Sequence, residues 1–276
     1  GDLYLGKTSV LAKDTPAFIA NRIGVFGIMA VFKTMEKLNL SIDEVDALTG
    51  PIIGRPKSAT FRTADVVGID TLVKVAKGIE ENCPEDEAKD YFKIPAWLEK
   101  MVANNWLGDK TGQGFFSKRK NQEGATEIYT LDLKTFEYKP RQKPKFSSFE
   151  LAKPVEDLKH RLKILFGAQD KAGEFYRQFH YGLFSYISHR IPEISDEVYR
   201  IDDAMKAGFG WEIGAFETWD VLGVGETVKA MEVAGFTVAA WVKEMLQNGN
   251  THFYKIENGQ KLVYDPVSKL YKAIPG

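Results

Sequence analysis

One stretch of this sequence occurs twice, and this repetition limits what the chain can fold into. Residues 45–68 read VDALTGPIIGRPKSATFRTADVVG, and residues 201–223 read IDDAMKAGFGWEIGAFETWDVLG. The residues that coincide at an offset of 155, with one residue of slippage at the first pair, are Asp46 and Asp202, Phe61 and Phe216, Asp65 and Asp220, and Gly68 and Gly223. A later pair of tripeptides, Ala96-Trp97-Leu98 and Ala240-Trp241-Val242, keeps the same order. Such an ordered series indicates a tandem duplication, because chance does not supply it, and two copies are too few for a solenoid.

The expected organisation is two compact units joined by a linker. At 276 residues the chain is longer than one typical domain, which has about 100–150 residues. Residues 140–150 (PRQKPKFSSFE) contain two prolines and two serines among polar side chains, a composition typical of linkers. We therefore predict copy one over residues 1–139, a linker over 140–150, and a degenerate copy two over 151–276.

Local patterns predict a mainly α-helical fold with small β-hairpins. Asp14-Thr15-Pro16 is a strong helix start, because a capping side chain precedes proline at the first helical position. Apolar residues then keep near-helical spacing on several faces to about Asn39, which predicts a long and largely buried helix. Further helix starts are expected at the capping box of residues 41–44, at Asp70 and at Pro95. A short strand is expected over residues 8–13, and β-hairpins over 125–139 and 252–265.

The charge and cysteine content exclude several classes of function. The formal net charge is -1, with Lys and Arg interspersed among Asp and Glu, so no nucleic acid partner is expected. Cys83 is the single cysteine. It can form neither an intramolecular disulfide nor a multi-cysteine metal site, and it fits a reducing, cytoplasmic location. The acidic loop around Cys83 predicts an inert thiol with a raised pKa. No stretch approaches eighteen uninterrupted apolar residues, and no secretory signal pattern is present, so no membrane span is expected.

Three motifs in copy one identify a family resemblance. They are KDTPAFIANRI over residues 13–23, RPKSATFRTADVVGIDTL over 55–72 and NNWLGDKTGQGFFSK over 104–118. In this order and spacing they resemble the C-terminal domain of 3-hydroxyacyl-CoA dehydrogenases, which occurs in tandem in multifunctional β-oxidation members. The resemblance implies two tandem helical domains of the 6-phosphogluconate-dehydrogenase C-terminal type. Two departures stand out: Ala17 replaces a usual glycine, and Ser58-Ala59-Thr60 replaces the usual Gly-Pro before Phe61, with one extra residue upstream that could alter the turn near the substrate groove.

The resemblance also implies a reaction and a missing domain. The complete enzyme would oxidise an L-3-hydroxyacyl-CoA to the 3-ketoacyl-CoA with NAD. The NAD site and a catalytic histidine–glutamate pair would lie on a Rossmann domain, whereas this sequence contains no G-x-G-x-x-G loop. Because the chain opens abruptly at Gly1-Asp2-Leu3, we expect a fragment that is inactive alone. Its expected partners are an acyl-CoA substrate and the missing N-terminal domain. Some family members with tandem copies also carry an enoyl-CoA hydratase domain, and whether one follows here is left open.

The resemblance carries one catalytic residue over to this chain. Asn21 matches a substrate-orienting asparagine, and a neutral amide can hydrogen-bond to a hydroxyl or thioester oxygen without taking its proton. The alternative is an asparagine that satisfies backbone groups inside a helix. Lys110, with Thr111 and Gly112, could lie near a CoA phosphate or form a solvated turn. Arg22 is expected to form a structural salt bridge, with the groove entrance as the alternative.

Copy two is expected to contribute structure rather than a second active site. The positions opposite Asn21 fall at Tyr176 and Arg177, where no F-I-x-N-R motif survives. The histidines at 160, 180, 189 and 252 are expected to be structural or surface residues, with no metal or cofactor site, and the tryptophans at 97, 211, 219 and 241 to be core or repeat-interface residues. Gly223-Val224-Gly225 is interpreted as a helix–helix turn. Two hypotheses remain: copy two mimics the partner subunit of a dimer, or the whole chain is a non-catalytic helical scaffold.

Overall fold

The computed structural model describes residues 13–275, and in this range the chain is mainly helical, which confirms the predicted fold class. The α-helices are α1 (Pro16–Leu38), α2 (Ile42–Leu48), α3 (Phe61–Val67), α4 (Ile69–Asn82), α5 (Ala96–Ala103), α6 (Ser147–Ala152), α7 (Leu158–Gly167), α8 (Lys171–His189), α9 (Val198–Phe209), α10 (Ala215–Leu222), α11 (Val224–Val233) and α12 (Ala240–Gln247). Short 3-10 helices are η1 (Pro51–Ile53), η2 (Lys89–Phe92) and η3 (Asp109–Thr111). The strands are β1 (Phe116–Lys120), β2 (Thr126–Leu131), β3 (Tyr138–Pro140), β4 (Tyr254–Glu257), β5 (Gln260–Asp265) and β6 (Leu270–Ala273). Apart from Lys13, the strand predicted over 8–13 lies outside the described residues.

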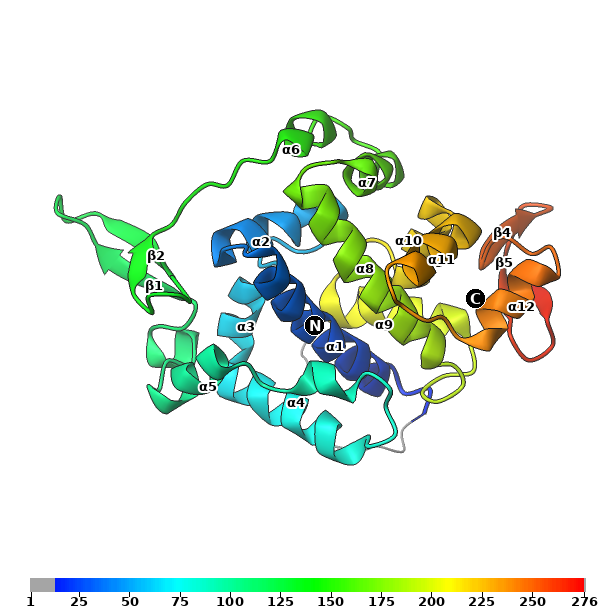
Figure 1. Cartoon of the computed structure of the whole chain (residues 1–276), viewed down its shortest axis with the longest axis horizontal. Coiled ribbons are helices and arrows are strands. Elements are labelled where there is room, and N and C mark those ends of the chain that lie inside the picture. Colours follow the sequence, from blue (N-terminus) through cyan, green and yellow to red (C-terminus); the bar gives the residue numbers. More distant parts are fainter. Residues whose placement is uncertain (1–12, 276) are drawn as a thin grey trace.

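Helix α1 forms the middle of the molecule (Figure 1). Proline occupies its first turn, and Asn39 ends it with a left-handed φ of 55°, so the helix predicted over 16–39 is confirmed. By length and composition α1 could cross a membrane, but most of it is buried inside the protein. A helix that is apolar on nearly every face is a core helix when other elements surround it.

The elements of the two copies follow the same order along the chain. Helices α1 to α5 lead into the antiparallel sheet β1-β2-β3, and helices α8 to α12 lead into the antiparallel sheet β4-β5-β6. Each predicted hairpin is therefore part of a three-stranded sheet. Strand β1 was not predicted, because the residues before it, TGQG, are typical of a turn. Strand β6 was not predicted either, because the predicted hairpin ended at Asp265. The two sheets lie at opposite ends of the molecule (Figure 1).

The repeated aspartates explain why the two copies share a motif. The Asp46 carboxylate accepts backbone N–H bonds from Thr60, Phe61 and Arg62 at 2.7–3.1 Å. Its counterpart Asp202 accepts from the first turn of α10 in the same way, at 2.9 and 3.1 Å. Because each carboxylate satisfies N–H groups that have no partner within the helix, it fixes where the following helix begins.

The second repeated aspartate joins its own helix, α3 or α10, to the sheet of the same copy. Asp65 accepts from the backbone N–H groups of Phe115 and Phe116 at 2.8 and 3.0 Å. Asp220 accepts from Phe253 and Tyr254 at 2.8 and 2.9 Å. Burial raises the pKa of Asp65 to about 6 and that of Asp220 to about 7, although these backbone bonds favour the charged form. The same contacts therefore recur in both copies.

Two local predictions need correction. Gly68, not Asp70, precedes the first residue of α4, and Asp70 is instead the second residue of that helix, paired with Lys110. The sequence does not distinguish these positions, because an aspartate is favourable in either. Within the segment predicted as a linker, residues from Ser147 onward are helical, as the start of α6.

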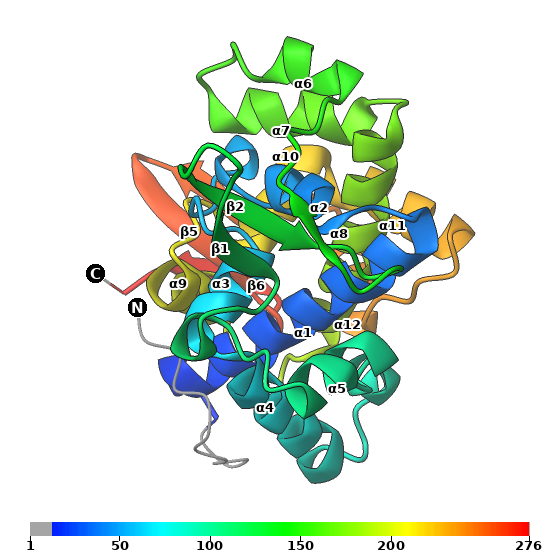
Figure 2. The same cartoon turned by 90° about the vertical axis from the view of Figure 1, so that its left-hand side faces the viewer.

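The two copies pack against each other along α1. Helix α1 contacts α8 and α9 of copy two, and both copies contribute to one continuous set of buried apolar side chains. Helices α6 and α7 precede α8, the counterpart of α1, and α7 packs against α8, α10 and η1. Figure 2 shows α6 and α7 at one end of the molecule and α4 and α5 at the other. A pocket between α1 and α9 can therefore receive walls from both copies.

Candidate substrate pocket

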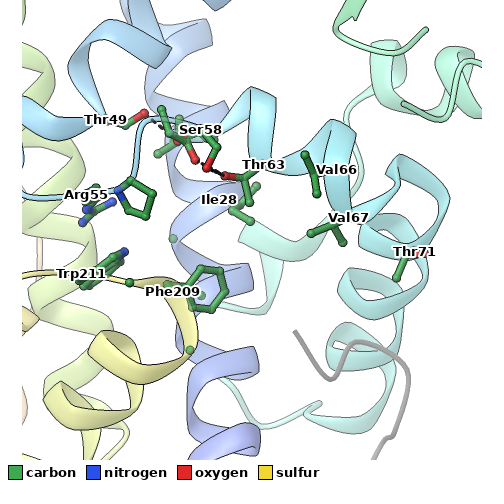
Figure 3. Close-up of a pocket in the computed structure, with 18 residues that line it drawn as sticks. Ile28, Thr49, Arg55, Ser58, Thr63, Val66, Val67, Thr71, Phe209 and Trp211 are labelled. Carbon is green, nitrogen blue, oxygen red and sulfur yellow. Dashed lines mark hydrogen bonds between the residues drawn. The ribbon is translucent and has the colours of Figure 1, made fainter. Parts of the chain in front are cut away.

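A pocket of about 590 Å³ lies between α1, the segment from η1 to α4, and the C-terminal end of α9 with the two residues after it (Figure 3). Its size is within the range of small-molecule sites, about 300–1,000 Å³. The residues that line it are Gly24, Gly27, Ile28, Val31, Thr49, Arg55, Pro56, Ser58, Ala59, Thr60, Thr63, Val66, Val67, Thr71, Gly208, Phe209, Gly210 and Trp211. These side chains are mostly apolar, with several hydroxyl groups and one charged group, that of Arg55.

The floor of the pocket is one face of α1. Gly24, Ile28 and Val31 recur at helical spacing and line it, together with Gly27. Asn21 lies one turn before Gly24 and continues the same row of positions, although it is not itself among the lining residues. At 1.5 Å per residue, Ile28 lies about 10 Å along the helix from Asn21. The predicted catalytic residue is therefore placed at the N-terminal extension of the pocket floor.

The two glycines of the floor differ in what surrounds them. A Cβ atom at Gly24 would lie 2.0 Å from the Phe209 ring, so the absence of a side chain lets α9 approach α1. A Cβ atom at Gly27 would meet no atom within 4 Å, because that position faces open pocket. Gly24 therefore serves packing between the copies, and Gly27 leaves room in the pocket.

This difference gives a stability prediction. Gly24→Ala is expected to destabilise the fold by about 1–3 kcal/mol through overpacking against Phe209. Gly27→Ala is expected to stabilise it by about 0.5–1 kcal/mol, because alanine favours a helix interior and clashes with nothing here. Urea unfolding of both variants checks the prediction, and effects of the same sign would contradict it.

The second wall is the segment in which this sequence departs from the family pattern. Ala59 adopts a φ of 49°, a left-handed conformation that glycine takes without strain. Two hydroxyl pairs brace the segment: Thr60 with Thr49 at 2.9 Å, and Thr63 with Ser58 at 2.8 Å. The departure therefore lies in the wall of this pocket.

The third wall comes from copy two, which the sequence analysis did not assign to a site. Phe209, the last residue of α9, closes the pocket together with Gly210 and Trp211, and the backbone N–H of Glu212 donates to the Gly54 carbonyl at 2.8 Å. Arg55, also missed, stacks on Trp211 with its guanidinium carbon 3.9 Å from the ring centroid. No sequence pattern relates residue 55 to residue 211. The one feature that could have indicated a functional arginine was the polar RPKS segment within an otherwise apolar motif.

Lys110 does not line this pocket. Its Nζ lies 2.5 Å from Asp70 Oδ1, and both side chains are partly exposed. The neighbouring Thr111 hydroxyl accepts the N–H of Leu107 at 2.9 Å and donates to the Gln113 carbonyl at 3.0 Å. The closing turn is thus held by its own hydrogen bonds, and the structure does not bring Lys110 together with the pocket.

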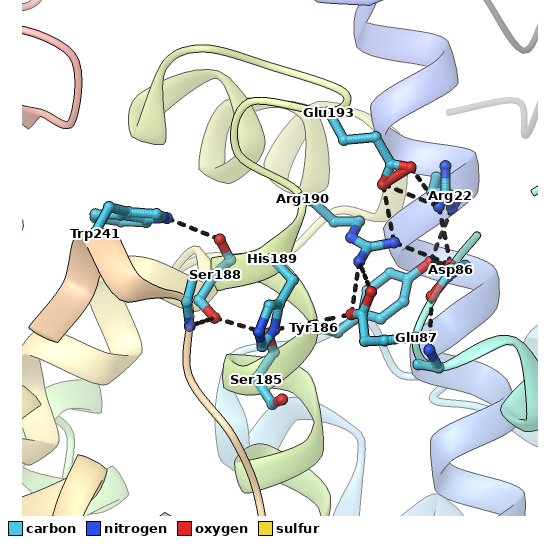
Figure 4. Close-up of polar contacts among 12 residues, drawn as sticks. Arg22, Asp86, Glu87, Ser185, Tyr186, Ser188, His189, Arg190, Glu193 and Trp241 are labelled. Carbon is cyan, nitrogen blue, oxygen red and sulfur yellow. Dashed lines mark hydrogen bonds and ion pairs between the residues drawn. The ribbon is translucent and has the colours of Figure 1, made fainter.

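Arg22, beside Asn21 on α1, lies in a buried ion cluster between the copies (Figure 4). Its guanidinium contacts Asp86 at 2.9 Å, Glu193 at 3.0 Å and the Tyr186 hydroxyl at 2.8 Å. Arg190 contacts the same Asp86 at 2.9 Å. The predicted structural salt bridge of Arg22 is confirmed, and it fixes the turn of α1 that carries Asn21.

The other singled-out side chains have structural surroundings. His180 is buried, and its Nδ1 lies 2.9 Å from the Tyr176 carbonyl; burial lowers its pKa to about 3. Burial likewise raises the pKa of the Cys83 thiol, the predicted direction. Trp219 is fully buried and stacks on Phe184, which confirms it as a core residue. Among residues 13–275, no group of three or more His, Cys, Asp or Glu side chains could hold a metal ion.

Opposite Asn21, copy two uses its residues for packing. The Tyr176 hydroxyl donates to the Leu48 carbonyl at 2.7 Å, and Arg177 donates to the carbonyls of Phe166 and Ala168, both at 2.7 Å.

Gly223 joins α10 to α11 with a φ of 91°, so the predicted helix–helix turn is confirmed.

Comparisons with known proteins show which family the sequence resembles. A protein-family model described as the 3-hydroxyacyl-CoA dehydrogenase C-terminal domain matches residues 18–118. A protein of Bacillus subtilis named "Probable 3-hydroxyacyl-CoA dehydrogenase" is 44% identical over 265 residues, which cover 96% of this chain and 33% of that protein. A fatty acid oxidation complex trifunctional enzyme of Rickettsia prowazekii is 27% identical over 216 residues, covering 77% of this chain and 28% of its own length.

A solved structure supports the fold. The 3-hydroxybutyryl-CoA dehydrogenase of Escherichia coli K12 superimposes with a TM-score of 0.56 at 15% identity, covering 85% of this chain and 61% of that one. Because 85% of the chain reaches well beyond residue 118, the similarity in fold includes parts of copy two.

Fold and motifs together define a helical domain of the kind found at the C-terminal side of dehydrogenases. The chain belongs to the 3-hydroxyacyl-CoA dehydrogenase family. It spans about a third of the length of the curated relatives that it matches.

Proposed function

We propose that this chain forms the substrate side of an enzyme that oxidises an L-3-hydroxyacyl-CoA to the 3-ketoacyl-CoA with NAD in fatty-acid β-oxidation. The observation that supports this most directly is the pocket beside α1, whose floor continues the row of positions that begins at Asn21. An acyl chain could lie over Gly27 and Ile28, where the floor is open, with its reacting carbon toward the Asn21 end of the helix.

In this proposal Asn21 is the catalytic residue of the chain. Its side-chain N–H would donate a hydrogen bond to the hydroxyl or thioester oxygen, and an amide cannot remove the proton that a base elsewhere must take. The neighbouring Arg22 cluster holds this turn of α1 in place. Precise placement of such a donor matters because its contribution depends on geometry. Lys110 remains a second candidate, for a CoA phosphate reaching the closing turn.

One glycine-rich segment can be compared with a dinucleotide loop. Gly223 joins α10 to α11 and Gly225 lies in the first turn of α11, whereas a pyrophosphate loop joins a strand to a helix. The proposal therefore assigns NAD and the histidine–glutamate pair to a Rossmann domain outside this chain, so that the chain alone is inactive. A cytoplasmic location and a neighbouring enoyl-CoA hydratase domain complete the proposal.

The test is restoration of activity with the nucleotide-binding domain. Joining that domain to this chain is expected to give NADH-dependent reduction of acetoacetyl-CoA, and Asn21→Ala to lower kcat by about 100- to 1,000-fold. Asn21→Asp has nearly the same shape but only acceptor oxygens at neutral pH, so it is expected to be at least as impaired. Full activity in both variants would show that Asn21 has no catalytic role.

The rival function is a non-catalytic helical scaffold, which the structural use of Tyr176 and Arg177 in copy two favours for that half. A scaffold predicts no turnover even with the nucleotide-binding domain attached. The related hypothesis that copy two mimics a partner subunit predicts a chain that does not dimerise through copy one. Light scattering that shows an obligate dimer through those helices would count against it.

A further inference from the structure

One charged side chain in the pocket has no counter-ion. Within residues 13–275, the Arg55 guanidinium makes neither a hydrogen bond nor an ion pair. It is the single ionisable side chain among the residues that line the pocket, since the others are apolar, glycine or hydroxyl-bearing. By contrast, Arg22, Arg62 and Arg190 each contact a carboxylate at 3.0 Å or less.

Arg55 is held in place by aromatic rings rather than by acids. Its guanidinium carbon lies 3.9 Å from the centroid of Trp211 and 5.4 Å from that of Phe179. Figure 3 shows Arg55 above Trp211 at one side of the pocket, across from Val66, Val67 and Thr71. Such stacking fixes the plane of the guanidinium and leaves its N–H donors for a ligand.

The surroundings make this cation costly unless something pairs with it. Arg55 is only partly exposed, and desolvation lowers its pKa to about 9, so the group remains charged at neutral pH with part of its water lost. A guanidinium in such a place binds oxyanions through paired, charge-assisted hydrogen bonds, which are stronger than neutral ones. The neighbouring walls, Ile28, Val31 and Val66, suit an aliphatic chain.

We propose that Arg55 binds an oxyanion of the acyl-CoA ligand in this pocket and so determines which ligands the site prefers. The inference rests on the proposed function and deepens it by naming the chemistry at the end of the pocket. Two sources supply that chemistry: a carboxylate at the far end of the acyl chain, or a phosphate of CoA. Trp211, contributed by copy two, positions the guanidinium, so the duplication would add a specificity element to the site of copy one.

The experiment measures binding of three probes to the 276-residue chain by calorimetry and by tryptophan fluorescence: adipoyl-CoA, hexanoyl-CoA and free CoA. If the oxyanion is a terminal carboxylate, adipoyl-CoA is expected to bind at least about tenfold more tightly than hexanoyl-CoA. A hydrogen bond to a charged group changes affinity by about this factor. Arg55→Met should remove this preference. If the oxyanion is a CoA phosphate, Arg55→Met should weaken all three probes by the same factor.

Matched variants separate charge from fold. Arg55→Lys keeps the charge without the planar fork and should retain part of the affinity. Arg62→Met, at an exposed arginine that pairs with Asp109 outside this pocket, should change nothing. Gly27→Leu fills the pocket floor and should weaken hexanoyl-CoA and adipoyl-CoA alike. Thermal unfolding of Arg55→Met should be unchanged or higher, because it removes an uncompensated charge.

Unchanged affinities in Arg55→Met, or no binding of any probe to the folded chain, would overturn the inference. Its failure differs from failure of the proposed function, since acetoacetyl-CoA turnover by the complete enzyme tests Asn21 and involves no terminal carboxylate. If turnover depends on Asn21 but Arg55→Met leaves the affinities of the probes unchanged, the proposed function is retained and this role for Arg55 is rejected.

Discussion

Asp86→Ala is expected to destabilise the protein by about 3–5 kcal/mol, because it removes the one fully buried carboxylate of the cluster and leaves two buried arginines to share the partly exposed Glu193. The Asp86 carboxylate lies 2.9 Å from both Arg22 and Arg190 and also accepts the Tyr186 hydroxyl at 2.7 Å. Its side chain is fully buried, and those of both arginines are 2% exposed. Burial alone would raise the pKa of Asp86, but the arginines and the tyrosine hydroxyl hold it below its usual value, so the carboxylate is charged at neutral pH.

Urea unfolding at neutral pH measures the loss, and two variants serve as controls. Asp90→Ala removes an exposed carboxylate 3.4 Å from Lys93 on the same side of the molecule and is expected to cost about 0–1 kcal/mol. Asp86→Asn keeps the shape without the charge and is expected to lie near Asp86→Ala. A cost below that of Asp90→Ala would show that the cluster contributes nothing to stability.

The same cluster shows how far sequence reasoning reaches. An acidic partner for Arg22 was predictable, because a buried guanidinium in a helix needs one. Its identity was not, since Asp86 lies in an irregular loop and Arg190 and Glu193 belong to the other copy. Helix α1 was predictable for the opposite reason: its start and its periodicity are both encoded within the helix itself.

The candidate site divides in the same way. Asn21 was found through a local motif on one helix. Arg55 and Trp211 meet only because α1 packs on α9, and no local pattern relates residues that lie more than a hundred positions apart. The duplication was visible because contacts repeated in each copy, such as those of Asp65 and Asp220, preserve the residues that make them. The contacts between the two copies join different residues on each side. They leave no repeated pattern in the sequence from which they could be predicted.

Phe61→Ala and Phe216→Ala are each expected to destabilise the protein by about 3–5 kcal/mol. Both rings are fully buried, and each packs edge-to-face on the aromatic residue that enters the following sheet, Phe115 or Phe253, at centroid distances of 4.6 and 4.9 Å. Because the substitutions are equivalent in the two copies, they test whether those copies are independent. Leu151→Ala, at a side chain that is 70% exposed, is the control and should change stability by about 0.5 kcal/mol or less.

Calorimetry distinguishes the two ways in which such a chain could unfold. Since α1 packs on α8 and α9, and the Arg22 cluster spans both copies, we expect one cooperative transition that either phenylalanine variant shifts downward as a whole. For a chain of this size the shift should be about 2–4 °C for each kcal/mol lost. Independent domains would instead give two transitions, with Phe61→Ala lowering one and Phe216→Ala the other. That outcome would mean that unfolding of either copy alone removes a wall of the pocket, so that the site exists only while both copies are folded and docked.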